Sequence, residues 1–376
     1  MNTNTCIASF LIFLISFMNC SENNEIVSPP EENRNIEVII NDIPYPTEKY
    51  LRIGYTLEMW EFAKEGLTLQ KIVVLNDETK EELLILEDIE SLLIYSHPIQ
   101  EVPFFEWDDI DHYYLSIQLP IPLAESPPAK VSHRIEFIDT NTNETVIFEG
   151  ALFEPRLNES PVSISSPVKG NNWIFGSQST MGYHFYTLFF ANGGIWSGER
   201  YAFDNLQLDD GLTGYLNGDP QINESYYNYL DTLFAVSDGI VVRFQDNLPE
   251  NDGDARNILF NSRTEYLGNY LVLDMGNGLY AGYVHCAPNS FFVGLNDIVR
   301  EGDPIALLGN SGNSVAPHLH FQITDGPDIF YSNGIPFVIK KYTRINEFDQ
   351  DLNLLNPPQT EFYDSMMEEY TIIGFE

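Results

Sequence analysis

The chain consists largely of short runs rich in β-branched and aromatic residues, broken by polar, glycine- or proline-containing turns. No long segment repeats its apolar residues with the 3.6-residue period of a helix. Residues 36–155 contain runs such as LRIGYTLEMW, LQKIVVLND and HRIEFID. Runs of this length and spacing are typical of antiparallel sandwiches. We therefore expect an all-β protein whose residues 36–155 form an N-terminal β-sandwich domain.

A second β-rich region, residues 173–345, is predicted to form a separate antiparallel domain, because its runs turn at Gly, Asn and Asp. Residues 156–172 are rich in Ser and Pro and are typical of a linker. The acidic residues 346–376 are expected to form a C-terminal tail without an assigned role. A length of 376 residues is compatible with two domains.

The N-terminus carries an apolar run, Ile7–Met18, that is too short to span a membrane comfortably. Such a run fits the hydrophobic part of a secretory signal, so we predict a signal peptide over residues 1–20 and an exported protein. Its end at Cys20 resembles a bacterial lipoprotein signal, which predicts lipidation of Cys20 and a membrane tether. The polar residues 21–35 would form a linker. A plain cleaved signal peptide and an uncleaved anchor are the alternatives.

The charge balance argues against nucleic-acid binding. The chain has 18 basic and 56 acidic residues, a net charge of -38, and this field repels a phosphate backbone. Of the cysteines, Cys6 and Cys20 lie in or beside the apolar N-terminal run, which leaves Cys286 alone in the body of the chain. We therefore expect no internal disulfide framework and interpret Cys286 as a buried apolar side chain.

The stretch GNSGNSVAPHLHFQI holds two histidines, His318 and His320, one residue apart in an apolar run. In a strand, residues i and i+2 point to the same face, so both imidazoles would share one small volume. This arrangement suits a metal ion better than it suits packing. Two more histidines, His184 and His285, fall in the same region, whereas the other three are isolated and are expected to be structural: His97, His112 and His133.

Catalytic zinc sites use three protein ligands and leave a position for water, whose pKa the metal lowers. Additional imidazoles can transfer protons and stabilise an oxyanion. The second region has enough histidines for both tasks, although their spacing alone leaves the assignment open.

Three segments, GYVHC, VREGDPIALLGNSGNSVAPHLHFQI and RYAFD, together resemble the M23 family of zinc metallopeptidases, the lysostaphin-like or LytM-type peptidoglycan endopeptidases. The resemblance covers roughly residues 173–342 and implies a small antiparallel β-fold. It implies three zinc ligands, His184, Asp204 and His320. It also implies two catalytic histidines that do not bind the metal, His285 and His318, one as general base and the other as stabiliser of the tetrahedral intermediate.

The first ligand departs from the usual HxxxD pattern of that family, since Arg200 occupies the place of the histidine and Glu199 lies beside it. The segment YHFYTLFFANGGIWSGERYAFD resembles a form with a longer insertion and offers His184 instead. Glu199 is the alternative ligand, because zinc also accepts carboxylates.

The resemblance thus implies an exported zinc endopeptidase that cleaves peptide cross-links or stem peptides of peptidoglycan. The alternative is a non-catalytic M23-like activator or scaffold of other cell-wall hydrolases, and a third possibility is a wall-binding module. The N-terminal sandwich would position the catalytic domain or bind a protein partner whose identity the sequence does not indicate.

Overall fold

The computed structural model describes residues 26–27, 36–59, 66–87, 113–176, 183–191, 193–252, 260 and 262–376. Strands dominate these residues, and the helices found there are short: α3 (Tyr183–Tyr186), α4 (Arg263–Leu267) and the 3-10 turn η2 (Asn223–Ser225). This confirms the all-β prediction. No helix in the described ranges is long and apolar enough to cross a membrane. The predicted signal peptide and Cys20 lie outside the described residues, as do His97 and His112.

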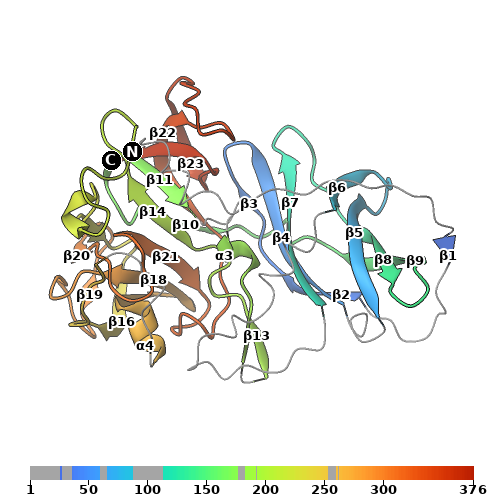
Figure 1. Ribbon diagram of the computed structural model, residues 1–376, viewed down its shortest axis with the longest axis horizontal. Coiled ribbons are helices and arrows are strands. Elements are labelled where there is room, and N and C mark those ends of the chain that lie inside the picture. The colour runs from blue at the N-terminus through green and yellow to red at the C-terminus, as the bar shows by residue number, and fades with distance from the viewer. Residues whose placement is uncertain are drawn as a thin grey trace.

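Two facing sheets form the N-terminal lobe, at the right of Figure 1. One sheet has the order β1 (Ile26–Val27), β9 (Thr145–Phe153), β8 (Val131–Asp139), β5 (Leu67–Asn76) and β6 (Glu82–Leu86). The other has the order β2 (Ile36–Asn41), β4 (Tyr50–Met59) and β3 (Tyr45–Pro46), and β7 (Tyr113–Pro122) also pairs with β4. One apolar cluster fills the space between them, which confirms the predicted sandwich.

Strand β4 is buried on both faces, and its two faces have different chemistry. Ile53, Tyr55 and Leu57 point into the sandwich core and are fully buried there. The alternate residues Arg52 and Thr56 are also buried. Each has one partner on β7, Gln118 or Ser116, and another in the C-terminal half of the chain, Glu368 or Arg200. Because side chains alternate between the faces of a strand, β4 serves the sandwich core with one face and the contact between lobes with the other.

The C-terminal lobe is built on one large, mostly antiparallel sheet. Its order is β10 (Val162–Ile164), β22 (Phe337–Glu347), β24 (Thr371–Phe375), β11 (Gly170–Gly176), β14 (Phe203–Gln207), β21 (Leu319–Thr324), β18 (Leu279–Cys286), β17 (Asn269–Gly276), β16 (Gly239–Gln245) and β19 (Ile298–Val299), and β23 (Thr360–Ser365) pairs with β22. Two strand pairs stand apart from it, β12 (Phe189–Ala191) with β13 (Gly194–Trp196) and β15 (Thr232–Phe234) with β20 (Pro304–Leu307). This order places β21 between β14 and β18, which are far from it in the sequence.

The acidic residues 346–376 supply two strands of this sheet, β23 and β24. Strand β24 lies between β22 and β11, and all five of its residues are buried. Composition alone did not indicate this pairing, because the acidic residues of the segment surround a short apolar run, TIIGF. The Ser/Pro-rich residues 156–172 likewise contribute β10 and the start of β11.

The lobes meet along α3 and the strand pair β12–β13, which lie at the junction in Figure 1. A small apolar cluster joins them, with Tyr114 of β7 packed against Leu188 and Phe190. Partly buried Ile39 and Ile195 pack against the same cluster, one from each lobe. Burial of such side chains stabilises the contact by about 1.5–3 kcal/mol each.

Candidate metal centre

Strand register brings the central residues of the site together. In the β14–β21 pair, Asp204 lies opposite His320, and in the β21–β18 pair His320 lies opposite Val284. Residues directly opposite each other on antiparallel strands have Cβ atoms about 4.5–5.5 Å apart. Asp204 and His320 are therefore neighbours although 116 residues separate them in the chain. The third residue, His184, comes from α3.

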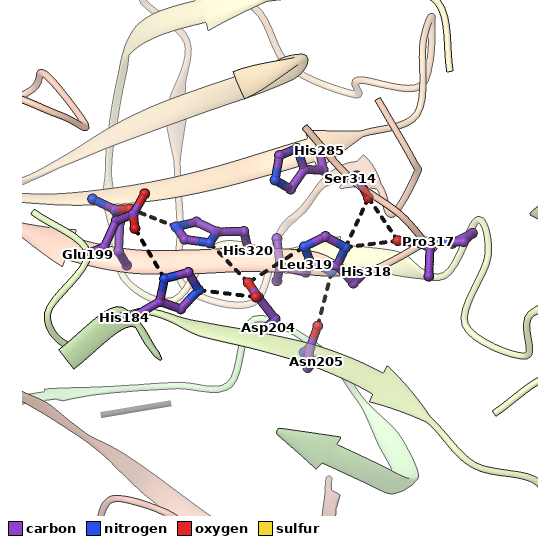
Figure 2. A network of polar contacts seen from close by, with 12 residues as sticks. His184, Glu199, Asp204, Asn205, His285, Ser314, Pro317, His318, Leu319 and His320 are labelled. Atoms are coloured by element: carbon purple, nitrogen blue, oxygen red, sulfur yellow. Dashed lines mark hydrogen bonds and ion pairs between the residues drawn. The ribbon is translucent and has the colours of Figure 1, made fainter. Parts of the chain in front are cut away.

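Three side chains converge on one small volume (Figure 2). His184 Nε2 lies 3.1 Å from Asp204 Oδ2, and His320 Nδ1 lies 3.0 Å from Asp204 Oδ1. One ligand-capable atom from each of these three residues lies within 4.8 Å of the other two. Both histidines are buried, with 7% and 6% of their surface exposed. The sequence-predicted ligand set thus occupies one place in the fold.

Gln322 determines which nitrogen of His320 carries the proton. The amide nitrogen of Gln322 donates to the carbonyl oxygens of Gly198 and Ile329, each at 3.1 Å. Its Oε1 therefore faces His320 Nε2 as an acceptor, at 2.8 Å. The proton of His320 resides on Nε2, so the lone pair of Nδ1 points at the Asp204 carboxylate.

His184 has a carboxylate at each ring nitrogen. Its Nδ1 lies 3.2 Å from Glu199 Oε2, on the side of the ring away from Asp204. A neutral ring that donates from Nδ1 to Glu199 presents the lone pair of Nε2 to Asp204. This carboxylate–histidine arrangement is typical of metal ligands, whose second nitrogen is oriented by an acidic partner. Glu199, the alternative ligand in the sequence analysis, is placed here as a partner of His184.

The electrostatics of the site call for a cation. Burial alone would raise the pKa of Asp204, but His184, His318 and His320 outweigh it and hold that pKa well below its usual range. Burial would likewise lower the pKa of His184, yet Asp204 and Glu199 raise it to about 10. In the absence of a metal, a proton on His184 supplies the positive charge that faces the Asp204 carboxylate. A divalent cation bound by these groups would take the place of that proton. A set of two imidazoles and one carboxylate suits Zn²⁺, so the residues present fit that ion.

His285 and His318 lie beside this cluster and share one tautomer. His285 Nδ1 donates to the carbonyl oxygen of Ser311 at 2.8 Å, and His318 Nδ1 donates to that of Ala316 at 2.8 Å. Each ring therefore keeps a lone pair on Nε2. The two ring centres are 4.9 Å apart, and His318 Nε2 lies 3.6 Å from Asp204 Oδ1.

The pKa values of both histidines lie below the ordinary value of an imidazole, which favours the neutral form. Burial, followed by the neighbouring His318 and His320, lowers the pKa of His285 well below its usual value. Burial also lowers the pKa of His318, although Asp204 partly offsets the effect. Neutral imidazoles with free lone pairs beside a cation site are able to accept protons.

Two residues outside the site behave as the sequence predicted. His133 is fully buried and structural, with Nε2 2.8 Å from Tyr55 Oη and Nδ1 3.0 Å from the carbonyl oxygen of Ala151. Cys286 is a free, fully buried cysteine within the main apolar cluster. Both predictions are confirmed.

Sequence reasoning missed Gln322, although a signal was present. Gln322 stands two residues after His320 and thus on the same face of β21. A third polar residue in the series His318, His320, Gln322 could have been identified as a partner of the second histidine. Asn205 was also missed. Its Oδ1 accepts a hydrogen bond from the Leu319 amide at 3.2 Å, and no pattern in the sequence indicates this contact, because it depends on the pairing of β14 with β21.

Comparison with known proteins gives partial matches. The family model "Peptidase family M23" matches residues 228–330, which include His285, His318 and His320 but neither His184 nor Asp204. The peptidoglycan DD-endopeptidase ShyB of Vibrio cholerae serotype O1 is 36% identical over 58 residues, which are 15% of this chain and 13% of that relative.

Similar solved structures include the catalytic domain of lysostaphin from Staphylococcus simulans, with 21% identity, 38% of this chain and 77% of that chain covered, and a TM-score of 0.24. Another is a putative peptidase M23 from Pseudomonas aeruginosa, with 13% identity, 71% of this chain and 93% of that chain covered, and a TM-score of 0.24.

Proposed function

We propose that the protein is an exported zinc-dependent endopeptidase that cleaves peptide cross-links or stem peptides of bacterial peptidoglycan, because the model of peptidase family M23 matches residues 228–330. The observation that carries this proposal is the meeting of three acceptor groups, from His184, Asp204 and His320, beside two neutral histidines. The local similarity to a peptidoglycan endopeptidase supports the choice of a cell-wall substrate.

In this proposal zinc is held by His184 Nε2, the Asp204 carboxylate and His320 Nδ1. When bound, the ion supplies a Lewis acid and lowers the pKa of water at its open position. Glu199 and Gln322 keep the two ligand imidazoles in the required tautomers.

His285 and His318 carry out the proton transfers. Each is anchored through Nδ1–H to a backbone carbonyl, so its Nε2 has a defined direction and a free lone pair. One Nε2 accepts the proton of the attacking water. The other takes up a proton from solvent at Nε2 and then donates a hydrogen bond to the oxygen of the scissile carbonyl as negative charge develops there. The leaving amine then recovers a proton from the first histidine.

The location of the enzyme is part of the proposal. A signal peptide over residues 1–20 would export it, and a lipid on Cys20 would tether it to a membrane facing the wall, with residues 21–35 as the spacer. The sandwich of residues 36–155 and the peptidase region of residues 173–345 would then act together on the wall.

Digestion of purified walls tests the proposal. Walls of several cross-link chemistries are incubated with the zinc-loaded protein, the chelated protein and the chelated protein resupplied with zinc. Mass spectrometry should find fragments with new amine and carboxyl ends in the first and third samples only. Equal digestion by the metal-free protein contradicts the mechanism. Stoichiometric zinc without fragments from any wall favours the non-catalytic activator instead.

A further inference from the structure

Arg200, which belongs to the segment between Glu199 and Asp204, is buried against the N-terminal lobe. Arg200 follows Glu199, lies four residues before Asp204, and is 0% exposed. Its Nη1 donates to Asp42 Oδ2 at 2.7 Å. Its Nη2 donates to Ser116 Oγ at 2.8 Å and also to the hydroxyl of Thr56.

The acceptors of Arg200 all belong to the N-terminal sandwich. Thr56 lies on β4, Ser116 lies on β7, and Asp42 comes directly after β2. Tyr201 makes a second hydrogen bond between the same segments, since its hydroxyl also donates to Asp42 Oδ2, at 2.7 Å. Two strands of the sandwich and the residue that follows a third thus hold Arg200 and Tyr201, which are consecutive residues shortly before Asp204.

The sequence of β4 is adapted to this contact at Gly54. A Cβ at that position would lie 2.4 Å from Tyr201 Oη and 3.2 Å from Asp42 Oδ2. A real Cβ does not approach an atom to 2.4 Å, so only glycine leaves space for the tyrosine hydroxyl without a shift of the segment.

The same arginine also reaches the element that carries the first histidine. Its guanidinium lies over the ring of Phe185, 5.3 Å from the ring centre, and Phe185 follows His184 in α3. On the opposite side of the segment, Gly198 packs so closely on the Ile329 carbonyl that a Cβ would lie 2.4 Å from its oxygen. Residues 198–201 are thus confined from both sides.

These contacts have an energetic consequence. A guanidinium that is fully buried is costly unless a carboxylate and hydrogen-bond acceptors surround it, so Arg200 has one favourable position, against Asp42. Residues on either side of a fixed arginine are limited in how far they can move. Glu199 and Asp204, which contact the two nitrogens of His184, are therefore positioned from the other lobe.

We propose that the N-terminal sandwich is a structural part of the metal centre: Asp42, with Thr56 and Ser116, acts through Arg200 as a positioning group that brings His184, Glu199 and Asp204 into metal-binding geometry. The assignment of a metal rests on the proposed function. The role given to the sandwich goes beyond it, because a sandwich that binds only a partner or the wall would not affect metal affinity.

The chain provides a matched control. Arg52 and Glu368 form another buried ion pair between the lobes, with Arg52 Nη2 2.7 Å from Glu368 Oε2 and side chains 8% and 9% exposed. Glu368 also accepts from the hydroxyl of Thr47. This pair joins β4 to the C-terminal segment, and its further hydrogen bonds in the described part of the chain run to Gln118 and Thr47 of the sandwich.

The test compares Asp42→Asn with Glu368→Gln in the full chain. Each replacement removes one buried carboxylate charge from an ion pair between the lobes with little change of shape. Zinc affinity is measured by competition with a chelator, and site geometry by the visible absorption of the Co²⁺-loaded protein. We expect Asp42→Asn to weaken zinc binding by about tenfold or more and to alter the cobalt spectrum, as loss of outer-shell partners does in metal sites. Glu368→Gln should leave both unchanged.

Equal effects of the two variants, or no effect of Asp42→Asn, would overturn the proposal. If Asp42→Asn does not fold, Ser116→Ala and Gly54→Ala are measured in its place, because both keep the ion pair between Asp42 and Arg200. Unchanged zinc affinity in both of these variants would also overturn the proposal. Wall cleavage does not enter these measurements. Suppose that Asp42→Asn binds zinc more weakly than the wild type and Glu368→Gln, but that the wild type cleaves no wall. This outcome contradicts the proposed function and leaves the present inference intact.

Discussion

Two buried histidines, one in each lobe, have opposite protonation behaviour. His133 lies in the sandwich between Tyr55 and a backbone carbonyl, and burial lowers its pKa to about 4. His184 lies in the C-terminal lobe, and there too burial would lower the pKa, but Asp204 and Glu199 raise it to about 10. The residue type and the burial are similar, so the carboxylates make the difference.

The comparison separates a packed histidine from a candidate ligand. A buried imidazole with neutral partners remains neutral and fills a position in the core. A buried imidazole between two carboxylates that, among the described residues, have no arginine or lysine partner has a raised pKa and holds a positive charge that a metal ion could replace. Asp42, also buried, does not create such a place, because Arg200 neutralises it. Largely buried carboxylates whose partners, among the described residues, are histidines are therefore the informative feature.

The largest effect is expected from Asp204→Asn. This change removes the charge that His184 and His320, the proposed ligands, both face, while it keeps the shape of the side chain. Zinc should be lost, and hydrolysis should fall on the order of 10⁴-fold. Metal analysis and wall digestion measure the two quantities, with circular dichroism to establish that the variant is folded. Stoichiometric zinc in a folded Asp204→Asn protein would contradict the ligand assignment.

A smaller loss is expected from His285→Ala, which removes a neutral proton acceptor but no proposed ligand. Zinc content should stay at the wild-type level, and kcat should fall about 10²-fold to 10³-fold, as is usual when a general acid–base group is lost. Single-turnover digestion of a soluble cross-linked peptide gives the rate. Loss of zinc from this variant would mean that His285 is itself a ligand.

A milder weakening is expected from Glu199→Gln. The amide still accepts a hydrogen bond from His184 but supplies no charge, so zinc affinity should fall by about tenfold. Activity should recover at high zinc concentration. His184→Ala provides the comparison and should not bind zinc stoichiometrically. The reverse pattern, with zinc kept by His184→Ala and lost by Glu199→Gln, would make Glu199 the first ligand.

The smallest effect on activity is expected from His133→Phe, which tests the packed histidine of the comparison. The ring would no longer pair with Tyr55 Oη, and loss of this buried partner should cost about 1–3 kcal/mol of stability at pH 7. Zinc content should not change. Urea unfolding of the variant and the wild type measures the difference.

The pH dependence of this difference has a definite sign. The pKa of His133 is about 4 in the folded protein, below the ordinary value of 6.5, so the folded state binds fewer protons between these values. The contribution of His133 to the free energy of unfolding is therefore complete above about pH 6.5. It is lost as the pH falls towards 4, by up to about 1.4 kcal/mol per pH unit. The gap between wild type and His133→Phe should therefore narrow at pH 5. A gap that widens would show that His133 is charged in the fold.

Several features of the fold and the site could be predicted from local patterns. The β-rich runs predict strands, and the alternation of His318, Leu319 and His320 places two imidazoles on one face. The interpretation of Cys286 as a core residue used the same alternation. Each of these conclusions depends on neighbours within a few residues, where the geometry of a strand is already known.

Other features depend on contacts between distant segments. Local patterns did not indicate that β24 would enter the sheet, nor that Gln322 would set the tautomer of His320. Arg200 appeared in the sequence as the residue in place of a histidine, and its buried position against Asp42 could not be inferred. Long-range pairing has no local signature, because it is selected by the packing of whole faces.

Residue type and strand alternation were enough to predict an all-β chain and to identify His318 and His320 as candidate chemistry. The five site residues came from the resemblance to a known family. The tertiary structure alone decided that Asp204 stands opposite His320, that Glu199 supports His184, and that the sandwich holds the segment between them. The physical reason is that side-chain direction follows from the backbone of one strand, whereas the distance between two charges is set by sheet register and the contact between lobes.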